Sequence, residues 1–192
     1  MNESKWSENV ILIDADFLDR VTFDLIVNFE RMIDRRIPAG NLCHWLDCVA
    51  LDGGLRPGDN DIQAIFIHAK DKKELQYMQP SDFGKELDGK AFKDNLGEFT
   101  LHSFPVEEIV SAEDFFVQSV EGILQGKDVR RLLVVADMER YGERVKRTVA
   151  KADEDKKITL FTMQPVTGRG FEQEILGYSL MSALGIRGEE LG

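Results

Sequence analysis

Two short apolar runs, each followed by acidic residues, constrain the fold of this chain more than any other feature of its sequence. They lie within Asn9–Asp14 and Arg131–Ala136, and neither contains a polar residue between its first and last positions. Strands with one solvated face alternate apolar and polar residues, whereas strands of a parallel sheet are covered on both faces and remain apolar throughout. The two runs therefore predict buried strands of a parallel sheet.

Segments with helical periodicity separate the predicted strands. In residues 19–35, apolar side chains recur at spacings of three and four with charged residues between them, which is typical of an amphipathic helix. Similar patterns predict helices over 41–53, 111–126, 139–152 and 171–186, and further strands over 62–68, 96–104 and 157–163. The polar stretch 70–95 is expected to be a loop with short helical pieces.

Strands that alternate with helices indicate βαβ units with right-handed crossovers. We therefore expect an α/β fold, a three-layer α/β/α sandwich with a central, mainly parallel sheet. A length of 192 residues suits a single domain over 1–192. Its core is expected at about 9–165 and its C-terminal helix at about 171–186.

Composition limits the class of protein. With 43% hydrophobic and 31% charged residues, the chain is an ordinary globular protein rather than a disordered or collagenous one. The formal charge of −11 argues against a broad electrostatic grip on nucleic acid, although a local basic stripe is compatible with it. Cys43 and Cys48 match neither a disulfide framework nor a paired zinc knuckle, so both are expected in the core. The sequence shows no signal-peptide pattern and no membrane-spanning run, which predicts a cytoplasmic protein.

Acidic pairs directly follow the two apolar runs. Asp14 and Asp16 follow the first run, and Asp137 and Glu139 follow the second. Ligand sites in parallel sheets form at the carboxyl ends of the strands, so these four carboxylates would converge if the two strands are neighbours. Such a cluster repels itself unless it binds a hard cation, for which Mg²⁺ or Mn²⁺ is the natural choice. The alternative is that each aspartate only caps the helix after it.

The order of these motifs resembles that of the PIN-like nucleases, and in particular of their NYN branch. The motifs that carry the resemblance are Ile11-Leu-Ile-Asp14-Ala-Asp16, Ser111-Ala-Glu-Asp114-Phe-Phe and Leu132-Leu-Val-Val-Ala-Asp137-Met-Glu139-Arg-Tyr141. Together they span roughly residues 9–165. The sequence departs from the NYN pattern at Phe17, where a polar asparagine is usual, and at Val135-Ala136, where a small hydroxyl residue is common. No lysine precedes the middle acid.

The resemblance implies a PIN/NYN-like fold and a metal-dependent ribonuclease. Asp14, Asp114, Asp137 and Glu139 would then hold one or two Mg²⁺ or Mn²⁺ ions that activate water for attack on a phosphodiester, with Asp16 as a further ligand. Basic residues recur on one face of the adjoining helix, which is either only a solvated face or a surface that guides single-stranded RNA toward the acids: Arg140, Arg144, Arg147 and Lys151.

Two alternatives remain open. The departures from the NYN pattern favour a non-catalytic regulatory or scaffold relative with an eroded metal site. The Asp14-Ala-Asp16 motif also resembles the haloacid-dehalogenase phosphatases, whose first aspartate is a nucleophile and whose second is a general acid. In those enzymes a hydroxyl residue and a later Asp-Asp pair are usual, and this chain has neither at the matching positions. Its three histidines, at positions 44, 68 and 102, suggest no catalytic triad and are expected to be structural or on the surface.

Overall fold

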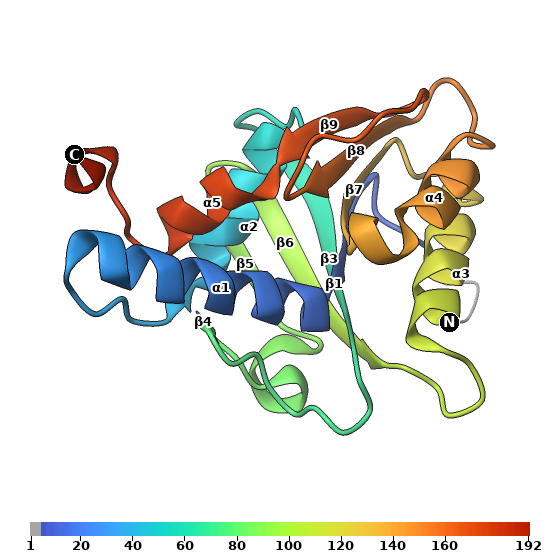
Figure 1. Ribbon diagram of the computed structural model, residues 1–192. Helices are drawn as coiled ribbons and strands as arrows, with labels where there is room; N and C mark the ends of the chain where they lie inside the picture. Colours follow the sequence, from blue (N-terminus) through green and yellow to red (C-terminus); the bar gives the residue numbers. More distant parts are fainter. Residues whose placement is uncertain (1–4) are drawn as a thin grey trace.

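A seven-stranded sheet forms the centre of the computed structural model, which describes residues 5–192 (Figure 1). The strands run in the order β5-β6-β3-β1-β7-β8-β9, and every neighbouring pair is parallel except β5 and β6. Their bounds are β1 Asn9–Asp14, β3 Asn60–His68, β5 Ala91–Asp94, β6 Gly97–Pro105, β7 Arg131–Val135, β8 Lys157–Thr162 and β9 Glu172–Ile175. A separate parallel pair consists of β2 (Gly40–Asn41) and β4 (Met78–Gln79).

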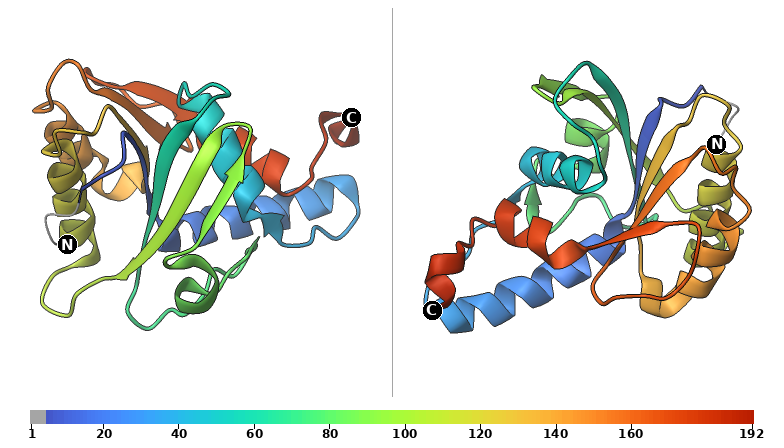
Figure 2. Two further views of the ribbon diagram at one scale, coloured as in Figure 1. Left: turned by 180° about the vertical axis from the view of Figure 1, so that it is seen from behind. Right: turned by 90° about the horizontal axis from the view of Figure 1, so that it is seen from above.

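Helices cover both faces of the sheet, as the view from above in Figure 2 shows. They are α1 Ala15–Ile33, α2 Leu42–Asp52, α3 Ala112–Leu124, α4 Met138–Val149 and α5 Leu176–Ala183, with short turns η1 (Phe83–Leu87) and η2 (Gly188–Leu191). Alternate side chains of β1 point to opposite faces: Ile11 and Ile13 pack with α1, α2 and α5, whereas Val10 and Leu12 pack with α3 and α4. The expected three layers of α/β/α architecture are thus present.

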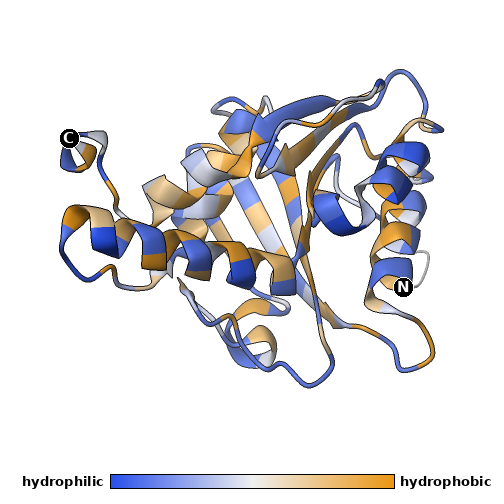
Figure 3. Cartoon of the chain, in the orientation of Figure 1, coloured by the Kyte–Doolittle hydropathy of each residue, from blue (hydrophilic) through white to orange (hydrophobic). Residues whose placement is uncertain are grey.

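Apolar side chains fill both interfaces of the sandwich. In Figure 3 apolar residues predominate along the central strands, and the helices alternate apolar with polar stripes. Trp45 of α2 is fully buried on one face of the sheet, and Phe116 of α3 is almost fully buried on the other. The apolar residues of both runs, 10–13 and 132–136, are buried from solvent, which confirms that the two runs are strands covered on both faces. Within residues 5–192, no helix combines the length and the apolar character needed to cross a bilayer.

The strand order places a crevice at a definite point of the sheet. Chain connections run outward from β1 in both directions, through β3 and β6 on one side and through β7 and β8 on the other. Counting only these five strands in chain order gives 3-2-1-4-5, the order of doubly wound folds. In such folds ligands bind beyond the carboxyl ends of the two strands at which the direction reverses, here β1 and β7.

Two sequence predictions differ from the structure. The helix expected over 171–186 is wrong in its first turn, because residues 172–175 form the edge strand β9 and α5 begins at Leu176. Three of the four β9 residues are exposed polar side chains, so backbone pairing with β8 decides the conformation there. The stretch 70–95 contains the expected short helical turn, but it also contains β4 and β5, of which β5 pairs antiparallel with β6.

A pair of carboxyl groups lies where α2 meets the turn between β5 and β6. Burial raises the pKa of Asp47 to about 7, and a hydrogen bond with the carboxyl of Asp94 adds to this shift. When both groups are ionised they repel each other, and Asp47 Oδ1 is buried with no donor to accept from. The folded protein therefore holds a proton that the unfolded chain would release at a lower pH.

We expect Asp47→Asn to stabilise the protein at pH 8 and to have little effect at pH 4. The pKa of Asp47 is higher in the folded state, so its contribution to stability is complete below about pH 4 and is lost as the pH rises through about 7. Because water screens this partly exposed group, the gain should be on the order of 1 kcal/mol, or about 2–4 °C in melting temperature. Thermal melts at the two pH values measure it, and equal increments at both would contradict the link to ionisation.

Candidate functional site

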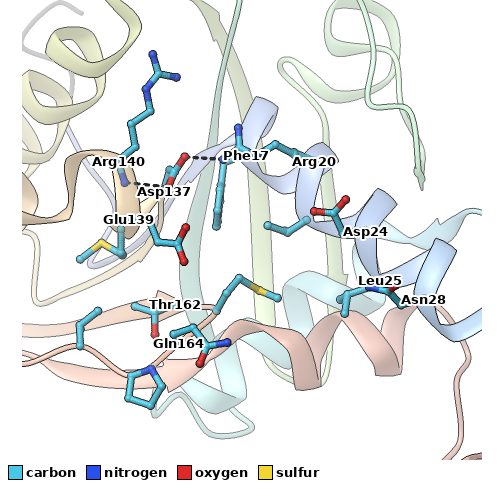
Figure 4. A pocket seen from close by; sticks show the side chains of 15 residues that line it. Phe17, Arg20, Asp24, Leu25, Asn28, Asp137, Glu139, Arg140, Thr162 and Gln164 are labelled. Atoms are coloured by element: carbon cyan, nitrogen blue, oxygen red, sulfur yellow. Dashed lines mark hydrogen bonds and ion pairs between the residues drawn. The ribbon is translucent and has the colours of Figure 1, made fainter.

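A cleft lies beyond the carboxyl ends of β1, β7 and β8, at the point that the strand order predicts (Figure 4). Its walls come from α1, from the start of α4 and from the segment after β8, and it encloses about 570 Å³. Phe17, Arg20, Asp137, Glu139 and Arg140 line one end of it. A volume of this size suits a small molecule or one unit of a polymer.

Asp14 ends β1 and caps α1. Its Oδ1 accepts a hydrogen bond from the backbone N–H of Phe17 at 3.1 Å, and its Oδ2 accepts one from the Tyr141 hydroxyl at 2.5 Å. Burial raises the pKa of the Asp14 carboxyl, although these two hydrogen bonds oppose that shift. The charges of Asp16 and Asp137 raise the pKa further. Both oxygens of this carboxylate therefore already have protein partners.

Asp137 occupies the equivalent position after β7 and caps α4. Its Oδ1 accepts from the backbone N–H of Arg140 at 3.1 Å, and its Oδ2 accepts from Arg20 Nη2 at 2.5 Å. The Tyr141 hydroxyl also accepts a bond of 3.4 Å from the Asp137 backbone N–H. One tyrosine hydroxyl thus contacts the ends of both strands, which confirms that Asp14 and Asp137 lie together at adjacent strand ends.

Tyr141 remains a proton donor in this setting. Burial raises the pKa of its hydroxyl, and the charge of Asp14 adds to the shift. Its backbone departs from helical values, with φ −134° and ψ 22°, so α4 is kinked in its first turn. Tyr141 is the last residue of the third motif identified in the sequence. Its contact with Asp14 could not be predicted from that motif, because it depends on the pairing of β1 with β7.

Arg20 is the cation that contacts Asp137 in the cleft. It lies on α1 one turn after Phe17, and its guanidinium carbon is 5.5 Å from the centre of the Phe17 ring. The aromatic face supports the guanidinium as that group reaches Asp137. Phe17 is the residue that departs from the usual asparagine of the NYN pattern, and here it helps to position a positive charge. Sequence reasoning missed Arg20, because its partner is 117 residues away.

Asp16 points away from the cleft. Its Oδ2 accepts from the backbone N–H of Ala69 at 3.0 Å, and its Oδ1 lies 3.4 Å from Lys72 Nζ. Both partners belong to the segment after β3, so Asp16 joins the start of α1 to that segment. It does not contribute to the lining of the cleft.

The acids of α3 contact α4 rather than the strand ends. Glu113 pairs with Arg140 at 2.6 Å, and Asp114 pairs with Arg144 at 2.6 Å. The hydrogen bond from Arg144 lowers the pKa of the Asp114 carboxyl, with a smaller contribution from Ser111. Two ion pairs therefore hold α3 against α4. They also engage two of the basic residues expected to guide RNA, whereas Arg147, on the same helix, is exposed.

Among the acids predicted to bind metal, Glu139 is the one whose carboxylate has neither a hydrogen-bond nor an ion-pair partner within residues 5–192. It is exposed and lines the cleft. Across that same range, no three His, Cys, Asp or Glu side chains are grouped so that they could hold a metal ion. As arranged, the acids do not fit a divalent cation, because donors occupy both oxygens of Asp14 and Asp137 and basic groups face Asp16 and Asp114.

Comparison with protein families gives one assignment. The sequence model of a single family matches residues 3–191, almost the entire chain. The chain belongs to DUF6621, described as a family of unknown function. The DUF6621 match contains every strand and helix of the fold, the whole cleft included. No curated protein and no solved structure matches the sequence.

Proposed function

We propose that this DUF6621 chain is a non-catalytic, PIN/NYN-like protein that binds single-stranded RNA in its cleft without hydrolysing it. The observation that carries the proposal is the ion pair between Arg20 and Asp137. A guanidinium occupies the carboxylate oxygen that a metal-dependent nuclease would offer to its cation. The rival proposal is the metal-dependent ribonuclease that the motif order implies.

The ion pair bears on catalysis because of what a metal does in such enzymes. Divalent ions lower the pKa of a bound water and stabilise the leaving oxygen. Arginine stays protonated in proteins and offers only N–H donors, so it binds phosphate without activating water. Replacing the cation by Arg20 therefore retains affinity for a phosphodiester and removes the nucleophile.

The lining of the cleft supports an RNA ligand. The side chains of Arg20 and Arg140 are 54% and 66% exposed, so each guanidinium keeps donors that its carboxylate partner does not use. Met138 and Pro165 add apolar surface to the same cleft, against which a base can pack. Because the chain carries a net charge of −11, we expect weak binding that decreases with salt.

Fluorescence anisotropy with a labelled single-stranded RNA tests the proposal. We expect saturable binding that is equal in EDTA and in Mn²⁺, with the RNA recovered intact. Arg140→Gln should weaken binding and reduce the salt slope by about 1, because Arg140 lines the cleft and its loss removes one phosphate contact. Arg130→Gln is the matched control, since Arg130 pairs with Asp155 away from the cleft and should leave binding unchanged.

Three other results would contradict the proposal, and the first two point to a different function. Cleavage of RNA that requires Mn²⁺ and stops with Asp14→Asn would establish the nuclease. Hydrolysis of a small phosphomonoester with RNA left intact would favour the hypothesis of a haloacid-dehalogenase-like phosphatase, with Asp14 as nucleophile and Asp16 as general acid. If RNA is neither bound nor cleaved, the RNA-binding proposal is wrong.

A further inference from the structure

A second group of reactive side chains lies outside the cleft, between α2 and α5, which are neighbours in the helical layer that also contains α1 (Figures 1 and 2). His44 and Cys48 are one turn apart on α2, and Ser182 on α5 faces them. His44 Nε2 lies 2.8 Å from Ser182 Oγ and 3.7 Å from Cys48 Sγ, and Cys48 Sγ lies 3.7 Å from Ser182 Oγ. None of the three residues lines the cleft.

The exposure of this group differs from the sequence prediction. Both cysteines were expected in the core, but Cys43 and Cys48 are only half-buried free thiols, so that expectation is wrong. The core stripe of α2 consists of Trp45, Leu46 and Val49, which leaves His44 exposed beside it. The histidine and the thiol are therefore accessible to a small ion.

The spacing of the two ligand atoms fits one tetrahedral metal ion. Zinc binds cysteine sulfur at about 2.3 Å and histidine nitrogen at about 2.0–2.1 Å. Two such bonds that meet at the tetrahedral angle place sulfur and nitrogen about 3.6 Å apart. His44 Nε2 and Cys48 Sγ are 3.7 Å apart. The helix thus holds both atoms at the separation that one Zn²⁺ requires.

We propose that His44 Nε2 and Cys48 Sγ bind one Zn²⁺ ion on the surface of α2. The thiol loses its proton to solvent as the sulfur–zinc bond forms, and the neutral imidazole gives its Nε2 lone pair to the metal in place of its contact with Ser182. Nitrogen and sulfur are the ligands that zinc prefers. Two protein ligands leave two tetrahedral positions for water, so this is an exchangeable site rather than a closed structural centre.

The surroundings favour a cation at this place. Burial raises the pKa of the Cys48 thiol, the hydrogen bond with Ser182 opposes that shift, and the charge of Asp52 adds to it. The carboxylate of Asp52, one turn further along α2, lowers the energy of a positive ion beside the sulfur. Ser182 remains available to donate its hydroxyl proton to the thiolate after it leaves His44.

Cobalt substitution tests the site in the reduced, full-length protein. We expect one equivalent of Co²⁺ to produce a sulfur-to-cobalt charge-transfer band and the visible bands of a tetrahedral ion, and we expect Zn²⁺ to displace it. Cys48→Ser should abolish the charge-transfer band, and His44→Gln should weaken binding by at least about tenfold, the lower limit for loss of a ligand or its support. Cys43→Ser is the matched control and should retain the spectrum.

Two results would overturn the proposal. One is the absence of a charge-transfer band in the wild-type protein at equimolar metal. The other is a band that persists in Cys48→Ser and disappears in Cys43→Ser. Circular dichroism of each variant shows whether it is folded, and Ser182→Ala, which removes the competing contact of His44 Nε2, should bind at least as tightly as the wild type.

Discussion

Arg20→Met is expected to give the cleft a higher affinity for Mn²⁺ than the wild-type protein has. The substitution removes the guanidinium that contacts Asp137 Oδ2 and keeps an apolar side chain against Phe17. Asp137 then has one free oxygen next to the strand end that bears Asp14, with Glu139 on the same cleft. Carboxylates brought together without a counter-charge favour a hard divalent ion.

The expected size of the effect follows from mass action. Without metal, Arg20→Met should be less stable than the wild type, because Asp137 is only 8% exposed and loses its cationic partner. At Mn²⁺ concentrations about 100 times the dissociation constant, binding should restore about 2.7 kcal/mol, a rise of about 5–10 °C in melting temperature. A thermal-shift titration with calorimetry measures both quantities.

Lys72→Met provides the matched control for this substitution. Lys72 contacts Asp16, which lies outside the cleft, so its loss should leave Mn²⁺ affinity unchanged. If wild type and Arg20→Met bind Mn²⁺ equally well, the Arg20 guanidinium does not occupy the position of a metal ion beside Asp137. If neither binds, the acids are too widely separated to share an ion.

The position of the cleft could be predicted from the sequence, whereas the basic partners of its acids could not. Uninterrupted apolar runs identify β1 and β7 as buried parallel strands, and the rule for such sheets places their terminal acids at one edge. The structure confirms this for Asp14 and Asp137, which share contacts with Tyr141. Local sequence pattern and the adjacency of two strands are enough to place these two acids together.

Partners of the acids come from distant parts of the chain, which explains why they could not be predicted. Arg20 is 117 residues from Asp137, and Arg144 is 30 residues from Asp114. Helical spacing correctly predicted that Arg140 and Arg144 share one face of α4. It could not predict which element packs against that face. The α3 acids lie opposite it, so part of the predicted RNA-guiding face is a contact between helices.

Short edge strands were the other feature that local pattern did not reveal. Residues 172–175 have no apolar alternation, and β5 has two exposed positions in four, so neither segment resembles a buried strand. Each is held by backbone pairing to a strand that is itself well predicted, β8 or β6. Tertiary pairing of this kind overrides local propensity.

Gly97→Ala should produce the largest loss of stability of any single methyl addition to the sheet. Gly97 begins β6 with φ +133° and lies opposite Asn60 in the β3–β6 ladder. A Cβ atom here would lie 2.0 Å from the Asn60 carbonyl oxygen and 2.6 Å from its nitrogen. Asn60 cannot retreat easily, because its side chain donates to Arg56 O and Leu96 O, both at 2.7 Å.

Backbone strain and this collision act together, so we expect a loss of about 3 kcal/mol or more and a melting temperature lower by about 6–12 °C. Gly122→Ala is the matched control, because Gly122 lies inside α3 and a Cβ there would meet nothing within 4 Å. It should stabilise the protein by about 0.5–1 kcal/mol, as alanine has the higher helix propensity. Denaturant unfolding of both variants gives the two free energies. Equal, small effects would mean that the start of β6 shifts to accept the methyl group, and that the close approach of Gly97 to Asn60 is not a constraint on the β3–β6 pairing.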